Sequence, residues 1–163
     1  MHGYGQPFAI PNFFIVVGIC LAGLILVPML LWRALGHLVA GPLEPGDRRL
    51  RRLGWLTGAA ALSVYTWGAL HLVLDETAAS DACHQVVRAA AGRNAEADIS
   101  AYRTTYVPLG FGCQVRGRGT FEAAVPAYVN PTAFGLAALG VLFVQLDRLA
   151  GGRRAADAPT AGS

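Results

Sequence analysis

The sequence predicts an all-α membrane protein in which three transmembrane helices carry a disulfide-stapled extracytoplasmic unit between the second and the third. Three observations predict this class. The 163 residues are 54% hydrophobic and only 14% charged, a balance typical of membrane rather than water-soluble domains. Three apolar runs each approach the length of a bilayer crossing. The long segment 75–130 between the last two runs holds Cys83 and Cys113. We interpret residues 1–163 as a single membrane domain.

The first apolar run, residues 13–32, contains no charged side chain, so a helix there covers the roughly 30 Å of a bilayer's hydrocarbon core. Pro28 predicts a kink near its end, which transmembrane helices tolerate. The second run, residues 54–74, has about the same length. Trp32 and Trp55 are then expected at one membrane interface, where aromatic residues collect.

The third apolar run covers residues 131–149. Asn130 and Pro131 precede it as a helix cap and a first helical residue, because an Asn oxygen accepts from free backbone N–H groups and proline at that position loses no bond. Gly151 and Gly152 are expected to stop the helix. The polar remainder, residues 151–163, is expected to be disordered.

The distribution of arginine predicts the orientation. All thirteen basic residues are arginines, which indicates a GC-rich bacterial genome. The hydrophilic connection 33–53 and the C-terminal end are arginine-rich, whereas the N-terminal segment has none, so both rich ends belong in the cytoplasm. We expect a plasma-membrane protein with its N-terminus outside and its C-terminus cytoplasmic. The arginines of the segment 75–130 are spread among carboxylates along a stretch too long for the charge rule to apply, so they do not oppose this orientation.

Four arginines form a dense cluster in the first connection. They are Arg48, Arg49, Arg51 and Arg52. Near an anionic leaflet each gains about 1 kcal/mol, so membrane lipids are the expected partner of this cluster. Nucleic-acid binding is not predicted, because no aromatic side chains accompany the arginines on a folded basic face.

The extracytoplasmic segment 75–130 is expected to fold as a short helix plus a β-hairpin. In an oxidising exterior, Cys83 and Cys113 are expected to pair, closing a loop of about thirty residues worth roughly 3 to 4 kcal/mol. A helix is predicted over 82–91, capped by Ser80 and stopped by Gly92. A second short helix is predicted over 95–102.

The hairpin is predicted from alternation. Phe111, Cys113 and Val115 lie on one face of a strand, and a second alternating run follows the glycine-rich turn 117–119. A disulfide between the helix and the hairpin would stabilise a unit whose own core is small.

Individual side chains suggest three kinds of chemistry: metal binding, thiol-disulfide exchange and transport. His71 and Asp75 share a helix face, and His84 follows Cys83, so these residues are weak candidates for a metal site, and a purely local role is favoured. A membrane thiol-disulfide oxidoreductase using Cys83 and Cys113 is an alternative, although such enzymes use a closely spaced CxxC pair that this chain lacks.

The third kind of chemistry is transport. A subunit of a small-molecule transporter requires a polar cavity, for which Ser63, Tyr65 and Thr66 are the available side chains. The apolar runs have few ionisable groups, and three helices enclose no pore alone.

Small residues at four-residue spacing predict close helix packing. These pairs are Gly54 with Gly58, Gly18 with Ala22, and Ala133 with Ala137. We expect them to pack the helices against one another rather than against an external partner.

No cofactor-binding pattern and no complete catalytic constellation occurs in the sequence, so no cofactor is predicted. The favoured function is a non-enzymatic accessory or partner-binding subunit that acts through its extracytoplasmic unit. Its partner is expected to be another protein or a second copy of this chain.

Overall fold

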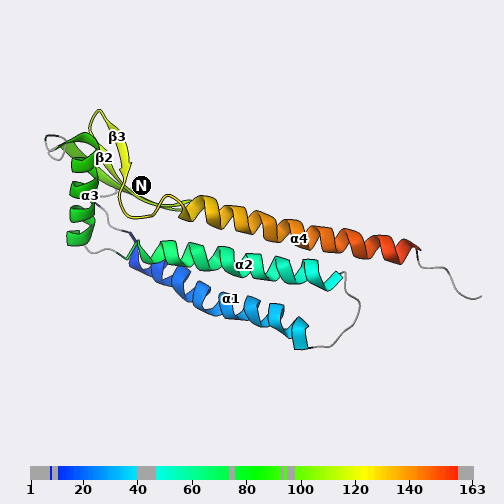
Figure 1. Ribbon diagram of the computed structural model, residues 1–163. Coiled ribbons are helices and arrows are strands. Elements are labelled where there is room, and N and C mark those ends of the chain that lie inside the picture. Colours follow the sequence, from blue (N-terminus) through cyan, green and yellow to red (C-terminus); the bar gives the residue numbers. More distant parts are fainter. Residues whose placement is uncertain are drawn as a thin grey trace, which may run out of the picture. The chain divides into compact units, whose positions relative to one another are not determined.

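A computed structural model describes residues 8, 11–39, 47–73, 76–92, 94 and 98–157 (Figure 1). The elements in order are α1 (Phe13–Val39), α2 (Asp47–Leu70), α3 (Glu76–Ala91), β1 (Ile99–Tyr106), β2 (Leu109–Val115), β3 (Gly119–Glu122) and α4 (Val129–Asp157). The chain divides into two compact units. One combines the chain up to Ala22 with Tyr65–Asn130, and the other combines Gly23–Val64 with the chain from Pro131 onward.

Two of the described helices, α1 and α4, are long and apolar enough to cross a membrane. The spans run from Phe13 to Gly36 and from Val129 to Gly152. Only 11% of the most apolar stretch of the first and 17% of the second is buried within the chain. A core helix of a water-soluble protein would be largely covered, so these helices leave a large apolar surface for lipid or another chain.

Helix α2 differs from the predicted span 54–74. It begins at Asp47, so the arginine cluster lies on its first turns rather than in a connection, and it ends at Leu70 in tight turns that include a bond from His71 N to Gly68 O. Hydroxyl-bearing side chains also interrupt its apolar part. It is therefore not among the described helices that could cross a membrane by length and composition.

The ends of α1 and α4 also differ from the prediction. Helix α1 begins at Phe13 as predicted, where Asn12 Oδ1 accepts from Phe14 N at 3.0 Å as a cap, but it continues past Trp32 to Val39, so residues 33–39 are helical and not part of a connection. Helix α4 begins at Val129 and continues through Gly151 and Gly152 to Asp157, so the expected disorder of 151–157 is wrong. Each glycine costs a helix only about 1 kcal/mol, and the alanines, arginines and leucine around them are good helix formers. Residues 158–163 lie outside the described part.

The strands form one antiparallel sheet in the order β1-β2-β3. The predicted hairpin is confirmed as β2 and β3, and its turn places Gly117 and Gly119 at φ of 75° and 91°, a region that glycine enters without strain. The predicted helix 95–102 is wrong over 99–102, which belong to strand β1, and residues 95–97 lie outside the described part. β-branched and aromatic side chains in this segment favour a strand, and β2 supplies the pairing partner.

Helix α3 packs against β2 and β3 within the same unit (Figure 1). It starts at Glu76, so Ser80 lies inside the helix and is not its cap. Ala79, Cys83 and Val87 lie one turn apart along one face and are all fully buried. The helix ends as predicted at Gly92, whose φ is 84°, and Arg118 of the β2–β3 turn donates to Ala91 O at 3.1 Å.

In the other unit, α2 packs against α4 through glycines. A Cβ at Gly54 would come within 2.9 Å of Val144 Cγ2, and a Cβ at Gly140 would come within 3.3 Å of Gly54 O and 3.4 Å of Gly58 N. Backbones approach this closely only where side chains are minimal. The missing side chains of Gly54 and Gly140 therefore allow this contact, whereas Gly58 contributes only its backbone and a Cβ there would have nothing within 4 Å.

Candidate functional site

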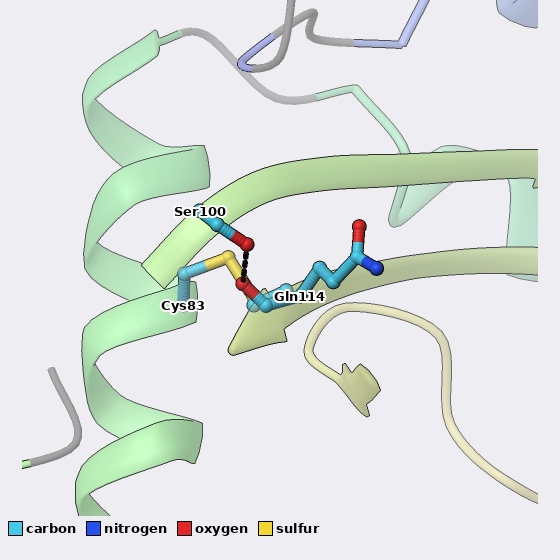
Figure 2. Close-up of a disulfide and its surroundings, with 4 residues drawn as sticks. Cys83, Ser100 and Gln114 are labelled. Carbon is cyan, nitrogen blue, oxygen red and sulfur yellow. Dashed lines mark hydrogen bonds between the residues drawn. A yellow bond between two sulfur atoms is a disulfide. The ribbon is translucent and has the colours of Figure 1, made fainter. Parts of the chain in front are cut away.

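Within the unit that contains α3 and the sheet, a disulfide joins Cys83 of α3 to Cys113 of β2 (Figure 2). The two Cα atoms lie 5.6 Å apart, and both residues are fully buried. Beside it, Ser100 Oγ donates to Gln114 O at 3.1 Å and joins β1 to β2 (Figure 2). The predicted pairing of the two cysteines is confirmed, and it fixes the helix to the middle strand of the sheet.

Burial of the disulfide bears on the redox alternative. Thiol-disulfide exchange requires an incoming thiolate to reach one of the two sulfur atoms, and catalytic pairs are accordingly exposed. Cys83 and Cys113 both have 0% exposure. A partner thiol cannot reach either sulfur without opening the unit, which favours a structural bond.

The β1–β2 turn is held from several elements of the same unit. Asn130 at the start of α4 bonds both backbone groups of Leu109, accepting from its N at 3.0 Å and donating to its O at 2.7 Å. The Tyr65 hydroxyl donates to Tyr106 O, and the Tyr106 hydroxyl accepts from Asn12 N at 2.7 Å. Asn130, predicted as a helix cap, thus joins the start of α4 to the β1–β2 turn through its side chain.

The register of the sheet separates its two faces. Tyr102, Thr104 and Tyr106 lie opposite Cys113, Phe111 and Leu109, and Phe121 lies opposite Cys113 from the other side. Phe111 and Cys113 of this face are fully buried. This face forms the core of the unit with α3.

The opposite face is polar and exposed, and we call it the polar sheet face. Its side chains are Arg103 and Thr105 of β1, Gln114 of β2, and Thr120 and Glu122 of β3. Gly110 and Gly112 occupy its middle, because neighbours lean over them: a Cβ at Gly110 would lie 2.8 Å from Thr105 Oγ1, and one at Gly112 would lie 2.7 Å from Thr120 Cγ2. The middle strand therefore cannot carry larger side chains on this face.

Charge on the polar sheet face is arranged symmetrically about Gly112. Arg103 pairs with Gly112 in the β1–β2 register, and Glu122 pairs with Gly112 in the β2–β3 register. Strands lie about 4.8 Å apart, so the two Cα atoms are roughly 10 Å apart across the face. Both side chains are exposed, and neither forms an ion pair with another described side chain. One positive and one negative group are thus available to a partner.

The metal candidates do not assemble among the described residues. His71 Nδ1 lies 3.0 Å from Trp67 O, and its ring contacts the Trp67 indole edge-on. His84 is exposed on α3, Asp75 lies outside the described residues, and no group of three His, Cys, Asp or Glu side chains in the described part is placed to hold a metal. The described contacts of His71 are local, to the last turn of helix α2.

The three side chains considered for transport have separate environments. Ser63 Oγ donates to Ala59 O within α2, and the Tyr65 hydroxyl bonds to Tyr106 O. The Thr66 hydroxyl is buried with no hydrogen-bond partner in the described part of the chain.

The remaining predicted residues lie on the helices. Gly18 and Ala22 of α1 are exposed, with open space around Gly18, and in α4 Ala133 is buried while Ala137 is exposed. Arg49 and Arg51 are exposed and Arg52 is half-buried. The side chain of Arg48 lies outside the described part.

Sequence reasoning did not single out Arg103 and Glu122. The signal that could have identified Arg103 is the alternation of side chains along a strand over 99–106, which places Arg103 on the face opposite to Tyr102 and Thr104. Comparison of the chain with protein-family models, curated proteins and solved structures gave no match to any of them.

Proposed function

We propose that the protein is a non-enzymatic plasma-membrane subunit that crosses the membrane three times and makes protein contacts through its extracytoplasmic unit. The proposal is carried by the polar sheet face: a rigid, disulfide-fixed surface with one free charge of each sign. The uncovered apolar surfaces of α1 and α4 support the membrane location.

In this proposal α2 is the third crossing. Its apolar part is interrupted by hydroxyl-bearing side chains, but its packing against α4 through Gly54 and Gly140 supports a place among the other two helices. The arginines at the start of α2 and the end of α4 support the cytoplasmic side for those ends, with the N-terminus and the segment 75–130 outside.

Thiol labelling of intact cells tests this topology. An impermeant maleimide is expected to label Cys83 and Cys113 of intact cells only after prolonged treatment with an impermeant reductant, and a reporter fused after Ser163 is expected to be active only in the cytoplasm. Labelling of either cysteine without reductant, or an active exported reporter, would refute the arrangement. Cys20, which is unpaired within α1, serves as the unlabelled reference.

A second copy of the chain is the partner that the polar sheet face fits. When two such faces stack about a twofold axis running along β2, β1 of one copy lies over β3 of the other. Arg103 then meets Glu122 of the other copy, and the same pair forms twice. The side chains of Thr105, Thr120 and Glu122 lean over the glycines of the middle strand, and Arg103 and Glu122 remain exposed to the other copy.

Charge reversal tests the contact. Arg103→Glu or Glu122→Arg converts both pairs into repulsive ones, and each is expected to weaken association by roughly 2 to 4 kcal/mol, about 30- to 1,000-fold in the dimer dissociation constant. The double variant restores both pairs and is expected to recover the dimer. Asp81→Arg, an equal charge change at an exposed position of α3, is the control.

The measurement is the oligomeric state in mild detergent, by analytical ultracentrifugation or single-molecule photobleaching. Recovery in the double variant supports association between copies. If either single variant loses the dimer and the double variant does not recover it, the polar sheet face binds a different protein, and the proposed self-association is overturned. A wild-type monomer without an associated protein would overturn the proposed function.

A further inference from the structure

The unit formed by Gly23–Val64 and the chain from Pro131 contains an open cavity of about 380 Å³ between α1 and α2. It is lined by Trp32, Arg33 and Gly36 of α1 and by Arg51 and Trp55 of α2. Its volume lies near the lower end of the roughly 300–1,000 Å³ range of small-molecule sites. We call it the arginine–tryptophan cavity.

The positions of its lining residues follow from helix periodicity. Trp32 and Gly36 are four residues apart on α1, and Arg51 and Trp55 are four apart on α2, so each pair shares a helix face. Gly36 has no side chain, and a Cβ at this position would have no atom within 4 Å, so the space beside this part of α1 is unfilled. The cavity is open at this point and has room for a ligand group.

The chemistry of the lining favours an anion. The Arg33 guanidinium carbon lies 5.7 Å from the centre of the Trp55 ring, a cation–π contact that orients the group. Arg51 brings a second guanidinium from the other helix. None of the carboxylates whose side chains the structure describes pairs with either arginine. Two guanidinium groups from different helices suit a phosphate, whose oxygens accept bidentate bonds from arginine.

The place of the cavity identifies the source of that phosphate. Trp32, Arg33 and Gly36 are at the end of the apolar span Phe13–Gly36, the depth at which lipid head groups begin. Trp32 is 79% exposed, and an indole at that depth is typical of the membrane interface. Basic pockets between membrane helices bind anionic head groups.

We propose that the arginine–tryptophan cavity binds the phosphate head group of one anionic phospholipid. This goes beyond general attraction of the arginine cluster to the membrane surface, because it assigns one lipid to one cavity. It rests on the membrane location in the proposed function but not on the contact made by the polar sheet face.

The test uses the full-length protein purified in detergent and titrated with phosphatidylglycerol or phosphatidylcholine, with retained lipid counted by native mass spectrometry. Ionic strength is kept at about 0.5 M so that surface attraction is largely screened. One phosphatidylglycerol is expected to bind in preference to phosphatidylcholine. Arg33→Gln and Arg51→Gln are each expected to lower its affinity roughly tenfold.

Two matched variants separate the cavity from the surface. Arg49→Gln removes an exposed charge from the same helix outside the cavity and is expected to bind as wild type. Gly36→Leu keeps every charge and fills the cavity, and it is expected to abolish the preference for phosphatidylglycerol. Arg33→Lys keeps the charge without the planar fork and is expected to fall between wild type and Arg33→Gln.

Equal binding of both lipids, or wild-type binding by Gly36→Leu, would overturn the proposal. Displacement of the lipid by millimolar inorganic phosphate or glycerol phosphate would assign the cavity to a soluble anion and overturn the lipid as its ligand. A chain recovered soluble without detergent would instead refute the membrane location itself, so the two failures are distinguishable.

Discussion

Breaking the Cys83–Cys113 bond is expected to destabilise the unit that contains α3 and the sheet, without unfolding the long apolar helices α1 and α4. The sequence separation is 30, for which the chain-entropy relation gives about 3.6 kcal/mol. Loss of the bond therefore raises the ratio of unfolded to folded unit about 400-fold. This loss is expected to fall on α3 and the part of the sheet next to the disulfide, because the β1–β2 turn is held separately by Tyr65 and Asn130.

The assay compares oxidised protein, protein reduced during unfolding and refolded with reductant, and the Cys83→Ala/Cys113→Ala variant. Pulse proteolysis in a urea series reports the fraction of unit that is unfolded. Cys20→Ala is the control, since it removes a cysteine without removing a bond, and no shift is expected from it. A difference below about 1 kcal/mol between oxidised and reduced protein would refute the reasoning.

The same bond makes a kinetic prediction that bears on the redox alternative. Because both cysteines are fully buried, reductant reaches the sulfurs only when the unit opens. The reduction rate is expected to level off as reductant concentration rises, at the opening rate of the unit. A rate that stays proportional to reductant would show accessible sulfur and support an exchange reaction instead.

Further substitutions probe the contacts around the sheet and between helices. Asn130→Ala removes both bonds to Leu109, which is only 2% exposed, and is expected to cost about 2 to 4 kcal/mol; Asn130→Asp keeps one acceptor and is expected to cost less, both measured by the same proteolysis series. Gly68→Ala drives a methyl group into Val129 Cγ1 and within 3.1 Å of Leu109 Cδ1, so overpacking of about 1 to 3 kcal/mol is expected to outweigh the gain in helix propensity. Gly58→Ala on the same helix meets nothing within 4 Å and is expected to leave thermal stability unchanged or raised by up to about 1 kcal/mol; equal effects of the two substitutions would contradict the packing.

Local patterns predicted part of this fold. The alternation around Cys113 and the glycines at 117 and 119 were sufficient for the hairpin, because turn chemistry and strand period agree there. The disulfide followed from two cysteines in one long polar segment. The apolar runs of α1 and α4 are continuous enough to be recognised from composition.

Other features depend on contacts that no local pattern contains. The predicted helix 95–102 overlaps the first half of strand β1, because the pairing partner β2 lies beyond the next turn and only that pairing decides the conformation of 99–106. Asn130 has the sequence of a cap, yet its side chain bonds to Leu109, which is twenty-one residues away. The arginine–tryptophan cavity joins residues of two helices, so no single stretch predicts it.

The two ends of the sheet are held by different means, and this limits what the disulfide can control. At one end Cys113, flanked by the Ser100–Gln114 bond, ties the strands to α3. At the other, Tyr65 and Asn130 hold the β1–β2 turn to the ends of α2 and α4. Loss of the disulfide should therefore release α3 while the turn stays attached. Amide exchange in the double alanine variant is expected to rise in 76–91 and to stay slow near Leu109. Fast exchange in both places would mean that the disulfide, and not the tyrosine and asparagine contacts, holds the whole unit together.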